Sequence, residues 1–361
     1  MGKGKIKLEA GMYQEAASKG LSLSDWMAWK ATTASNGEGA SFDWYNPELK
    51  TSSGKPLDAF EQALMHFGIR VRGEKASTGD AFFYDPNARV LFPEFLVREF
   101  RFAEQEGGNE LTVDDLIASR VGIDNGAYRG EYVDEGQSAE MLEVAEGAEL
   151  PTVIVKRHEN SIQLYKYGAL LRMTYEAVRR ARLDHLSTFI RKIALDSRRA
   201  KVRRAVKVLV NGDGNSNPAP DTTTANTSIT FDDIVDLVID FNNGFEPSVL
   251  VGLKQTVIRD ILKLDVFTAK DSTSTGASFR DTGDWPAPLG KQLRFVEGTP
   301  ELNKKLLGVD KRFALEEVFE NGSELVETDR LITSQFNVIA FSEVIGFAKM
   351  FTSASRTKTH A

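Results

Sequence analysis

Cysteine is absent from this chain of 361 residues. Its absence excludes disulfides, thiolate nucleophiles and the cysteine-based zinc and iron–sulfur sites. Histidine is scarce as well, and none of the four histidines lies at metal-ligand spacing from another. They are His66, His158, His185 and His360. The sequence therefore predicts no metal site and no cofactor, so that any function must come from other residue types.

Long apolar runs are also missing. No window approaches the roughly 18 continuous apolar residues of a membrane span, and the start of the chain lacks the apolar segment of a secretory signal. We therefore expect a protein that is made and folds in a cytoplasm and has no membrane partner. With 41% hydrophobic and 27% charged residues, the composition is that of a globular protein with one large core or two ordinary ones.

The sequence motifs of common enzymes are missing or incomplete. There is no G-x-S-x-G and no H-E-x-x-H motif, and the Gly-Lys pairs at Lys55 and Lys291 lack the other residues of a phosphate loop. The segment that begins at Asp213 resembles a calcium loop only at its start, because Pro218 stands where the loop needs glycine and Thr224 where it needs glutamate. Carboxylates are numerous, which leaves a paired-acid site open. We nevertheless predict a protein that is not an enzyme.

Charge is unevenly distributed along the chain, whose formal net charge is −7. Between Arg172 and Val210, twelve Lys and Arg residues stand against three acids, which is a local charge of +9. Residues 131–149 hold seven acids and no Lys or Arg. Opposite patches of this kind commonly fix the register of an interface, although both can also be solvated faces. The acidity of the remaining chain argues against strong DNA binding by the basic stretch.

The basic stretch is predicted to be one helix over residues 183–210, roughly 42 Å long at about 1.5 Å per residue, that ends at the turn sequence NGDGN. Its apolar positions form two sets, and the second is rotated by roughly 160° from the first. The sets are Leu186, Phe189, Ile190 and Ile193, and then Val202, Ala205, Val206 and Leu209. The two halves should therefore pack against different partners, unlike a helix that reads a DNA groove.

The sequence before the helix shows mixed patterns. Residues 1–75 have short helical segments joined by polar stretches, which is typical of an arm. A denser apolar region follows, with a strand expected before Pro93 and a helix after it. Residues 125–167 are predicted to form an extended acidic hairpin whose strands return toward the core.

After the helix, residues 228–305 are predicted to form an α/β or α+β unit. Thr230 is the expected N-cap of its first helix, and Asp233 stands at the third position of a capping box. A buried strand is predicted within residues 246–253 (EPSVLVGL), and a helix within residues 254–264 (KQTVIRDILKL). Residues 306–361 alternate short strands and turns and should pair back with the earlier core.

The order of these elements resembles the HK97-fold major capsid proteins of tailed phages. The resemblance covers about residues 92–351, and its most specific parts are the run from LRMTYEAVRRARLD to VLVNGDGN and the segment LLGVDKRFALEEVFENG. It implies an α+β, HK97-like capsid fold. The implied parts are an N-terminal arm (1–75), a peripheral domain (76–227) with an E-loop (125–167) and a spine helix (183–210), an axial α/β domain (228–305), and C-terminal strands (306–361) that return to both cores.

The resemblance also implies a function, that of a structural protein of a phage head. Copies would assemble into hexamers and pentamers, form an icosahedral shell around double-stranded DNA, and be found in the virion after assembly in the host bacterial cytoplasm. Further implied partners are portal, scaffolding and decoration proteins, with weak non-specific contact to packaged DNA. Residues expected to carry assembly are Glu131, Asp134, Glu135, Glu140, Glu143 and Glu146 of the E-loop, and Arg198, Arg199, Lys201, Arg203, Arg204 and Lys207 of the spine helix.

A specific hypothesis follows for the basic residues of the spine helix. Most of those from Arg198 to Lys207 should pair with protein carboxylates, some of them from the acidic loop of a neighbour. Reversing the charges of Arg199 and Arg203 should then block assembly and leave the monomer folded. Two alternatives remain: an encapsulin-like compartment shell of the same fold, and, from a different class, a DNA-binding protein that uses the basic helix 191–207.

Overall fold

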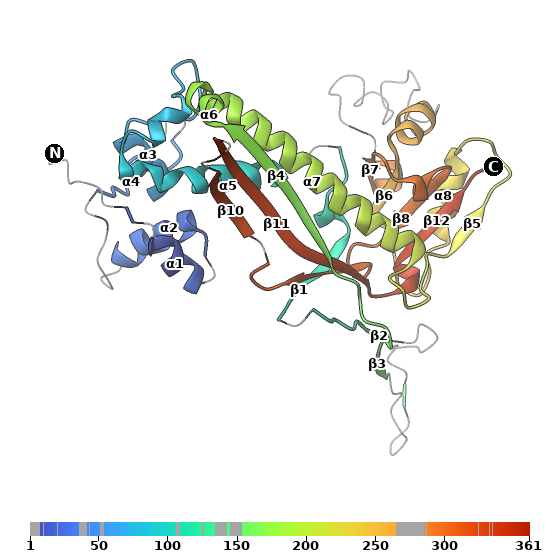
Figure 1. Cartoon of the computed structure of the whole chain (residues 1–361). Helices are drawn as coiled ribbons and strands as arrows, with labels where there is room; N and C mark the ends of the chain where they lie inside the picture. Colours follow the sequence, from blue (N-terminus) through green and yellow to red (C-terminus); the bar gives the residue numbers. More distant parts are fainter. Residues whose placement is uncertain are drawn as a thin grey trace. The chain divides into compact units, whose positions relative to one another are not determined.

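The chain folds into two compact units (Figure 1). The structure is a computed structural model, and it describes residues 8–9, 11–19, 21–35, 42, 44–50, 54–105, 109–124, 126–133, 143–144, 154–264, 285, 287–323, 325–331, 333 and 335–361. Unit 1 comprises Met1–Glu106, Gly168–Leu195 and Leu325–Ser342, and unit 2 comprises Gly107–Tyr167, Asp196–Glu324 and Glu343–Ala361. Three elements run from one unit into the other: β4 (Tyr165–Thr174), α7 (Leu183–Asn211) and β11 (Phe336–Lys349).

Unit 1 is mainly helical. Its helices are α1 (Gly11–Ser18), α2 (Leu23–Ser35), α3 (Ala59–His66), the 3-10 turn η1 (Gly79–Phe82), α4 (Pro86–Arg89), α5 (Leu91–Gln105) and α6 (Tyr175–Arg180), together with the first half of α7. Strand β10 (Leu325–Leu331) pairs antiparallel with the first half of β11, and β4 pairs with β11 as well. Helix α3 begins at Ala59, because Asp58 and Glu61 form a reciprocal capping box.

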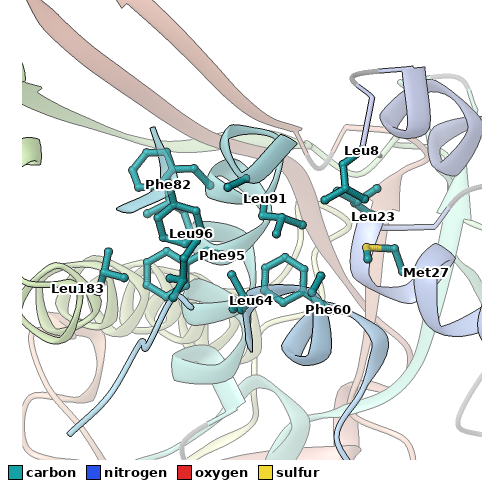
Figure 2. Close-up of a cluster of buried hydrophobic side chains, with 14 of the residues drawn as sticks. Leu8, Leu23, Met27, Phe60, Leu64, Phe82, Leu91, Phe95, Leu96 and Leu183 are labelled. Carbon is teal, nitrogen blue, oxygen red and sulfur yellow. The ribbon is translucent and has the colours of Figure 1, made fainter. Parts of the chain in front are cut away.

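The segment expected to be an arm is part of the unit 1 core. Leu23 and Met27 of α2 and Phe60 and Leu64 of α3 are buried in one cluster with side chains of later segments (Figure 2). Those later residues include Phe82, Leu91, Phe95, Leu96 and Leu183. Burying one such side chain contributes about 1.5–3 kcal/mol, so these short helices have a strong reason to pack instead of extending.

The strand expected before Pro93 is absent from the described residues of that region, which form α4 and α5 instead. Pro93 lies in the first turn of α5, where a helix does not need the N–H group that proline lacks. The proline therefore marks the start of a helix that also includes the two residues before it.

Unit 2 contains a five-stranded mixed sheet in the order β5-β12-β8-β6-β7. Its strands are β5 (Asp221–Thr223), β6 (Val249–Leu253), β7 (Gln292–Val296), β8 (Lys305–Val309) and β12 (Ser355–Thr359). The predicted strand β6 is confirmed, and helix α8 (Phe231–Ile239) begins with the expected Thr230–Asp233 capping box. The helix expected after β6 is one π-helical turn, η3 (Thr256–Ile261). Shorter 3-10 turns are η2 (Val113–Asp115), η4 (Pro288–Gly290), η5 (Pro300–Leu302) and η6 (Thr352–Ala354).

A second group of strands in unit 2 confirms that the late segment pairs back with earlier sequence. Strand β9 (Leu315–Glu320) lies between β1 (Ile117–Ile123), to which it is parallel, and the second half of β11, to which it is antiparallel. Strands β2 (Glu131–Val133) and β3 (Val155–Arg157) form a separate antiparallel hairpin, as expected for residues 125–167.

Asp310 fixes the corner between β8 and β9. Its fully buried carboxylate accepts hydrogen bonds from the backbone N–H of Glu246 at 3.0 Å and from Nε and Nη2 of Arg312 at 3.0 and 2.8 Å. Burial alone would raise the pKa of Asp310, but the hydrogen bonds outweigh burial and hold the pKa below its ordinary value. This contact gives the Asp and the Arg of the local sequence GVDKRFAL a structural role.

Replacing Asp310 with Asn should lower the free energy of unfolding by about 1–3 kcal/mol at neutral pH, because the charge-assisted bonds from Arg312 are lost. The carboxylate stabilises the fold above its unfolded pKa of about 3.9, and this contribution is lost as the pH falls through the lower folded pKa. The difference between wild type and Asp310→Asn should therefore shrink on acidification. Urea unfolding at pH 7 and at about pH 3, below the unfolded pKa of the carboxyl group, measures this difference, with the exposed Asp232→Asn as control. A constant difference between the two pH values would refute the role of ionised Asp310.

Candidate assembly site

Helix α7 extends over Leu183–Asn211, which confirms the predicted helix within one residue. Its first half packs in the unit 1 core through Leu183, Leu186 and Ile190. Its second half packs in a different core, in unit 2, and the buried residues there include Val202, Ala205, Val206 and Leu209. The expectation of two differently packed halves is confirmed. Phe189 is an exception, because its side chain is 63% exposed although it was placed in the first apolar set.

Glu110 is the main partner of the basic residues at the centre of α7. Residues on both sides of Glu110 pair with the edge of β7, since Leu111 N–H donates to the Phe295 carbonyl at 2.9 Å and Phe295 N–H donates to the Asn109 carbonyl at 3.3 Å. The Glu110 carboxylate then accepts hydrogen bonds from Arg199 Nε at 2.6 Å and from Arg198 Nη2 at 3.2 Å. The hydrogen bond to Glu110 raises the pKa of Arg199 above its ordinary value, although burial opposes the shift.

Three further carboxylates meet the basic half of α7, and all of them lie in unit 2. Arg199 lies 3.8 Å from Glu297, Lys201 lies 2.7 Å from Glu343, and Lys207 lies 4.0 Å from Glu301.

The other two basic residues have different neighbours. The guanidinium of Arg204 stacks on the ring of Tyr165 at 4.2 Å, and that of Arg203 lies against Gly298. Much of the positive charge of the helix is thus matched by acids and an aromatic ring of the same chain.

Two of the six predicted acids of the hairpin lie within the described residues. Glu131 pairs across the β2–β3 hairpin with Arg157 at 3.2 Å, and Glu143 is exposed. Asp134, Glu135, Glu140 and Glu146 lie outside the described residues. Glu110, Glu297, Glu301 and Glu343 were not predicted, because they are isolated acids scattered along the sequence and no local pattern marks them.

The outgoing strand of the hairpin is anchored to the sheet at Tyr128. The Tyr128 hydroxyl donates a hydrogen bond to Glu316, which also accepts one from Ser119 at 2.9 Å. Burial, followed by the hydrogen bond to Glu316, raises the pKa of Tyr128. Ile162 N–H donates to the Tyr128 carbonyl at 2.7 Å, and the Ile162 side chain is buried against Val318. These contacts hold the hairpin root to strands β1 and β9.

The NGDGN sequence forms the turn that ends α7. Gly212 has φ of +87°, and a Cβ there would lie 2.8 Å from Oδ1 of Asn217, so both the conformation and the close approach require glycine. Asp213 Oδ2 accepts the backbone N–H of Lys349 at 3.0 Å, while the buried Lys349 ammonium donates to the Leu209 carbonyl at 3.2 Å. The turn is therefore tied to the end of β11, and it is not a calcium loop with converging carboxylates.

The described residues contain no group of three or more His, Asp and Glu side chains arranged to hold a metal ion. Within the same residues, none of the helices combines the length and the hydropathy that crossing a bilayer requires. His158 stacks on Tyr132 at the hairpin, with ring centres 4.4 Å apart.

Several known proteins are similar to this chain. A family model described as "Phage capsid protein" matches residues 159–338. The chain is similar to the capsid of the native GTA particle, with a TM-score of 0.50 and 16% identity over 71% of this chain and 92% of that chain. It is also similar to the Mycobacterium phage Che8 structure, with a TM-score of 0.48 and 15% identity over 70% of this chain and 93% of that chain.

The holo-SrpI encapsulin of Synechococcus elongatus PCC 7942 is similar as well, with a TM-score of 0.42 and 14% identity over 67% of this chain and 84% of that chain. No curated protein matches the sequence. At these identities the structural similarity to the GTA capsid concerns the fold.

Replacing Glu110 with Gln should destabilise unit 2 by about 1–3 kcal/mol, because Arg198 is buried and both guanidiniums lose their shared carboxylate. A thermal unfolding scan should show a lower Tm for this variant. The exposed Glu48→Gln serves as control and should unfold like the wild type. An unchanged Tm for Glu110→Gln would show that these pairs contribute no net stability.

Proposed function

Because this chain is a phage capsid protein with the HK97-like fold, we propose that its copies assemble into hexamers and pentamers and build an icosahedral head around double-stranded DNA. The observation that carries the proposal beyond the family is the hairpin β2–β3. Its strands are three residues long, and Ile154 and Val155 are 55% and 62% exposed. A two-stranded hairpin with exposed apolar residues is marginally stable alone, and a neighbouring copy would cover it.

The proposed roles of the segments follow the expected capsid domains. Residues 125–167 would be the E-loop, α7 the spine helix, residues 228–305 the axial domain, and residues 76–227 with the returning strands the peripheral domain. Residues 1–75 would add a helical layer to the peripheral domain, since they pack with α5 and the first half of α7. We propose a structural role without catalysis.

The acidic hairpin is proposed to meet a neighbouring copy through charge. Fewer basic residues of α7 are then candidates for pairing with a neighbour, because Arg198, Arg199 and Lys201 already contact carboxylates of their own chain. The double reversal of Arg199 and Arg203 would disturb the Glu110 contact and is therefore a poor test of assembly. Lys207 is the better candidate for an intermolecular contact, since its side chain is 52% exposed and Glu301 is 4.0 Å away.

The proposed shell binds packaged DNA only weakly and without sequence specificity. Each phosphate that a protein neutralises adds salt-dependent affinity, and the charges of α7 are largely matched within the chain. Portal, scaffolding and decoration proteins are the further proposed partners, with assembly in the host bacterial cytoplasm. An encapsulin-like shell around a cargo enzyme is the second candidate of the same fold, and the phage capsid family match favours the head protein.

Reversing Glu140 and Glu146 to Lys should abolish or strongly reduce shell formation, because residues 131–149 would lose more than half of their negative charge. Electron microscopy of the expressed protein, with a scaffolding protein supplied if needed, measures the yield of round particles. The control is Glu48→Lys with Asp232→Lys, which changes net charge equally. Normal particles from the hairpin variant would contradict the charge contact, and a wild type that forms no particles or rings would contradict the capsid function.

The soluble chain should bind duplex DNA only non-specifically. A gel shift at 150 mM salt should show half-maximal binding above about 1 µM, in the range of non-specific affinity. Glu301→Gln removes the carboxylate beside Lys207 and should bind slightly more tightly. Sequence-specific nanomolar binding by the wild type would instead support the DNA-binding alternative.

A further inference from the structure

The segment that follows β3 contacts the turn that ends α7 through Asn160. Its Nδ2 donates a hydrogen bond to the Gly214 carbonyl at 3.0 Å, and its backbone N–H donates to Oδ1 of Asn215 at 3.2 Å. Asn160 thus contacts the turn with both its side chain and its backbone. The root on the opposite strand is held separately, by Tyr128 and Glu316.

The turn that Asn160 contacts is stabilised by its own hydrogen bonds. Asp213 Oδ1 accepts hydrogen bonds from the backbone N–H and from Nδ2 of Asn215 at 3.1 and 3.0 Å, and these bonds orient the Asn215 amide independently of Asn160. The same Asp213 carboxylate accepts the backbone N–H of Lys349 on β11 at 3.0 Å. A continuous set of hydrogen bonds therefore leads from β11 through Asp213 and Asn215 to the hairpin.

The contacts at the hairpin root have two different supports. Tyr128 precedes β2 and binds Glu316 of β9, and Ile162 packs against Val318 of the same strand. Asn160 follows β3 and binds the turn after α7 instead. The contacts with β9 alone would hold the root but leave the hairpin free to swing about that strand, and the contact of Asn160 with a separate support fixes its direction as well.

We propose that Asn160 is a positioning residue that sets the direction in which the acidic hairpin leaves unit 2, and thereby where the hairpin reaches the neighbouring copy. The effect on assembly rests on the proposed capsid function. The effect on the direction of the hairpin concerns the single chain and can be tested without assembly. The contact is solvent-exposed and made of neutral groups, so its loss should redirect the hairpin without unfolding the unit.

The first test uses hydrogen exchange in the unassembled chain. In Asn160→Ala, exchange at the amides of His158 and Ile162, which close the root through Gly130 and Tyr128, should be about three to ten times faster than in wild type. Asn215→Ala removes the other hydrogen bond, the one that its Oδ1 accepts from the Asn160 N–H, and should have a similar effect. The double variant, which lacks both hydrogen bonds, should exchange faster than either single variant. The neighbouring exposed Glu159→Ala is the control and should exchange like wild type.

The second test uses assembled particles and their diameters. Asn160→Ala should keep the Tm of the single chain and still form shells, but with a several-fold larger fraction of malformed or wrongly sized particles in cryo-electron micrographs. Unchanged exchange at both amides would overturn the proposal, and so would faster exchange with uniform particles. If the wild type forms no shell, the capsid function fails, while the exchange measurement still decides whether Asn160 holds the hairpin.

Discussion

The structure of unit 2 depends on balancing the positive charge of α7. A helix with six basic residues between Arg198 and Lys207 would repel itself if water alone screened it. Four carboxylates from three separate segments lie beside these residues, and that of Glu110 contacts two guanidiniums at once. Because Glu110 is placed by backbone pairing with β7, the charge contact also ties the segment before β1 to the edge of the sheet and to the helix.

The same helix links the two units through a change of buried face. Its first half contributes Leu186 and Ile190 to one core, and its second half contributes Val202 and Val206 to another. The helix therefore contributes buried side chains to both cores, each along a different part of its length. The charged residues then occupy the positions that neither core takes up.

Local signals in the sequence were sufficient for several elements. The bounds of α7, the Thr230–Asp233 capping box and strand β6 follow from periodicity, capping chemistry and β-branched runs that involve only near neighbours. The segment around Pro93 was misread because proline is compatible both with the end of a strand and with the first turn of a helix. Phe189 was wrongly assigned to the buried face of α7, because apolar periodicity identifies a stripe of apolar residues but does not show which of them are buried.

The candidate site was less predictable for a physical reason. Glu110 is 88 residues from Arg198 in the sequence, and the contact exists only after Asn109 and Leu111 have paired with Phe295 of β7. Sequence analysis identified the excess of basic residues on the helix but not the acids that match it. For the same reason, the contact of Asn160 with Gly214 could not be predicted: the NGDGN sequence indicates a turn, but no local pattern shows that Asn160, 54 residues away, binds it.

Strand β12 lies between β5 and β8, in the interior of the five-stranded sheet. Strand β8 also pairs with β6, whereas β5 has β12 as its neighbour in the sheet order. A chain without residues 355–359 would therefore leave β5 unpaired and would expose one edge of β8, and an open strand edge is a template for wrong pairing. The completeness of this sheet thus depends on a short segment that is remote in sequence from the strands it joins.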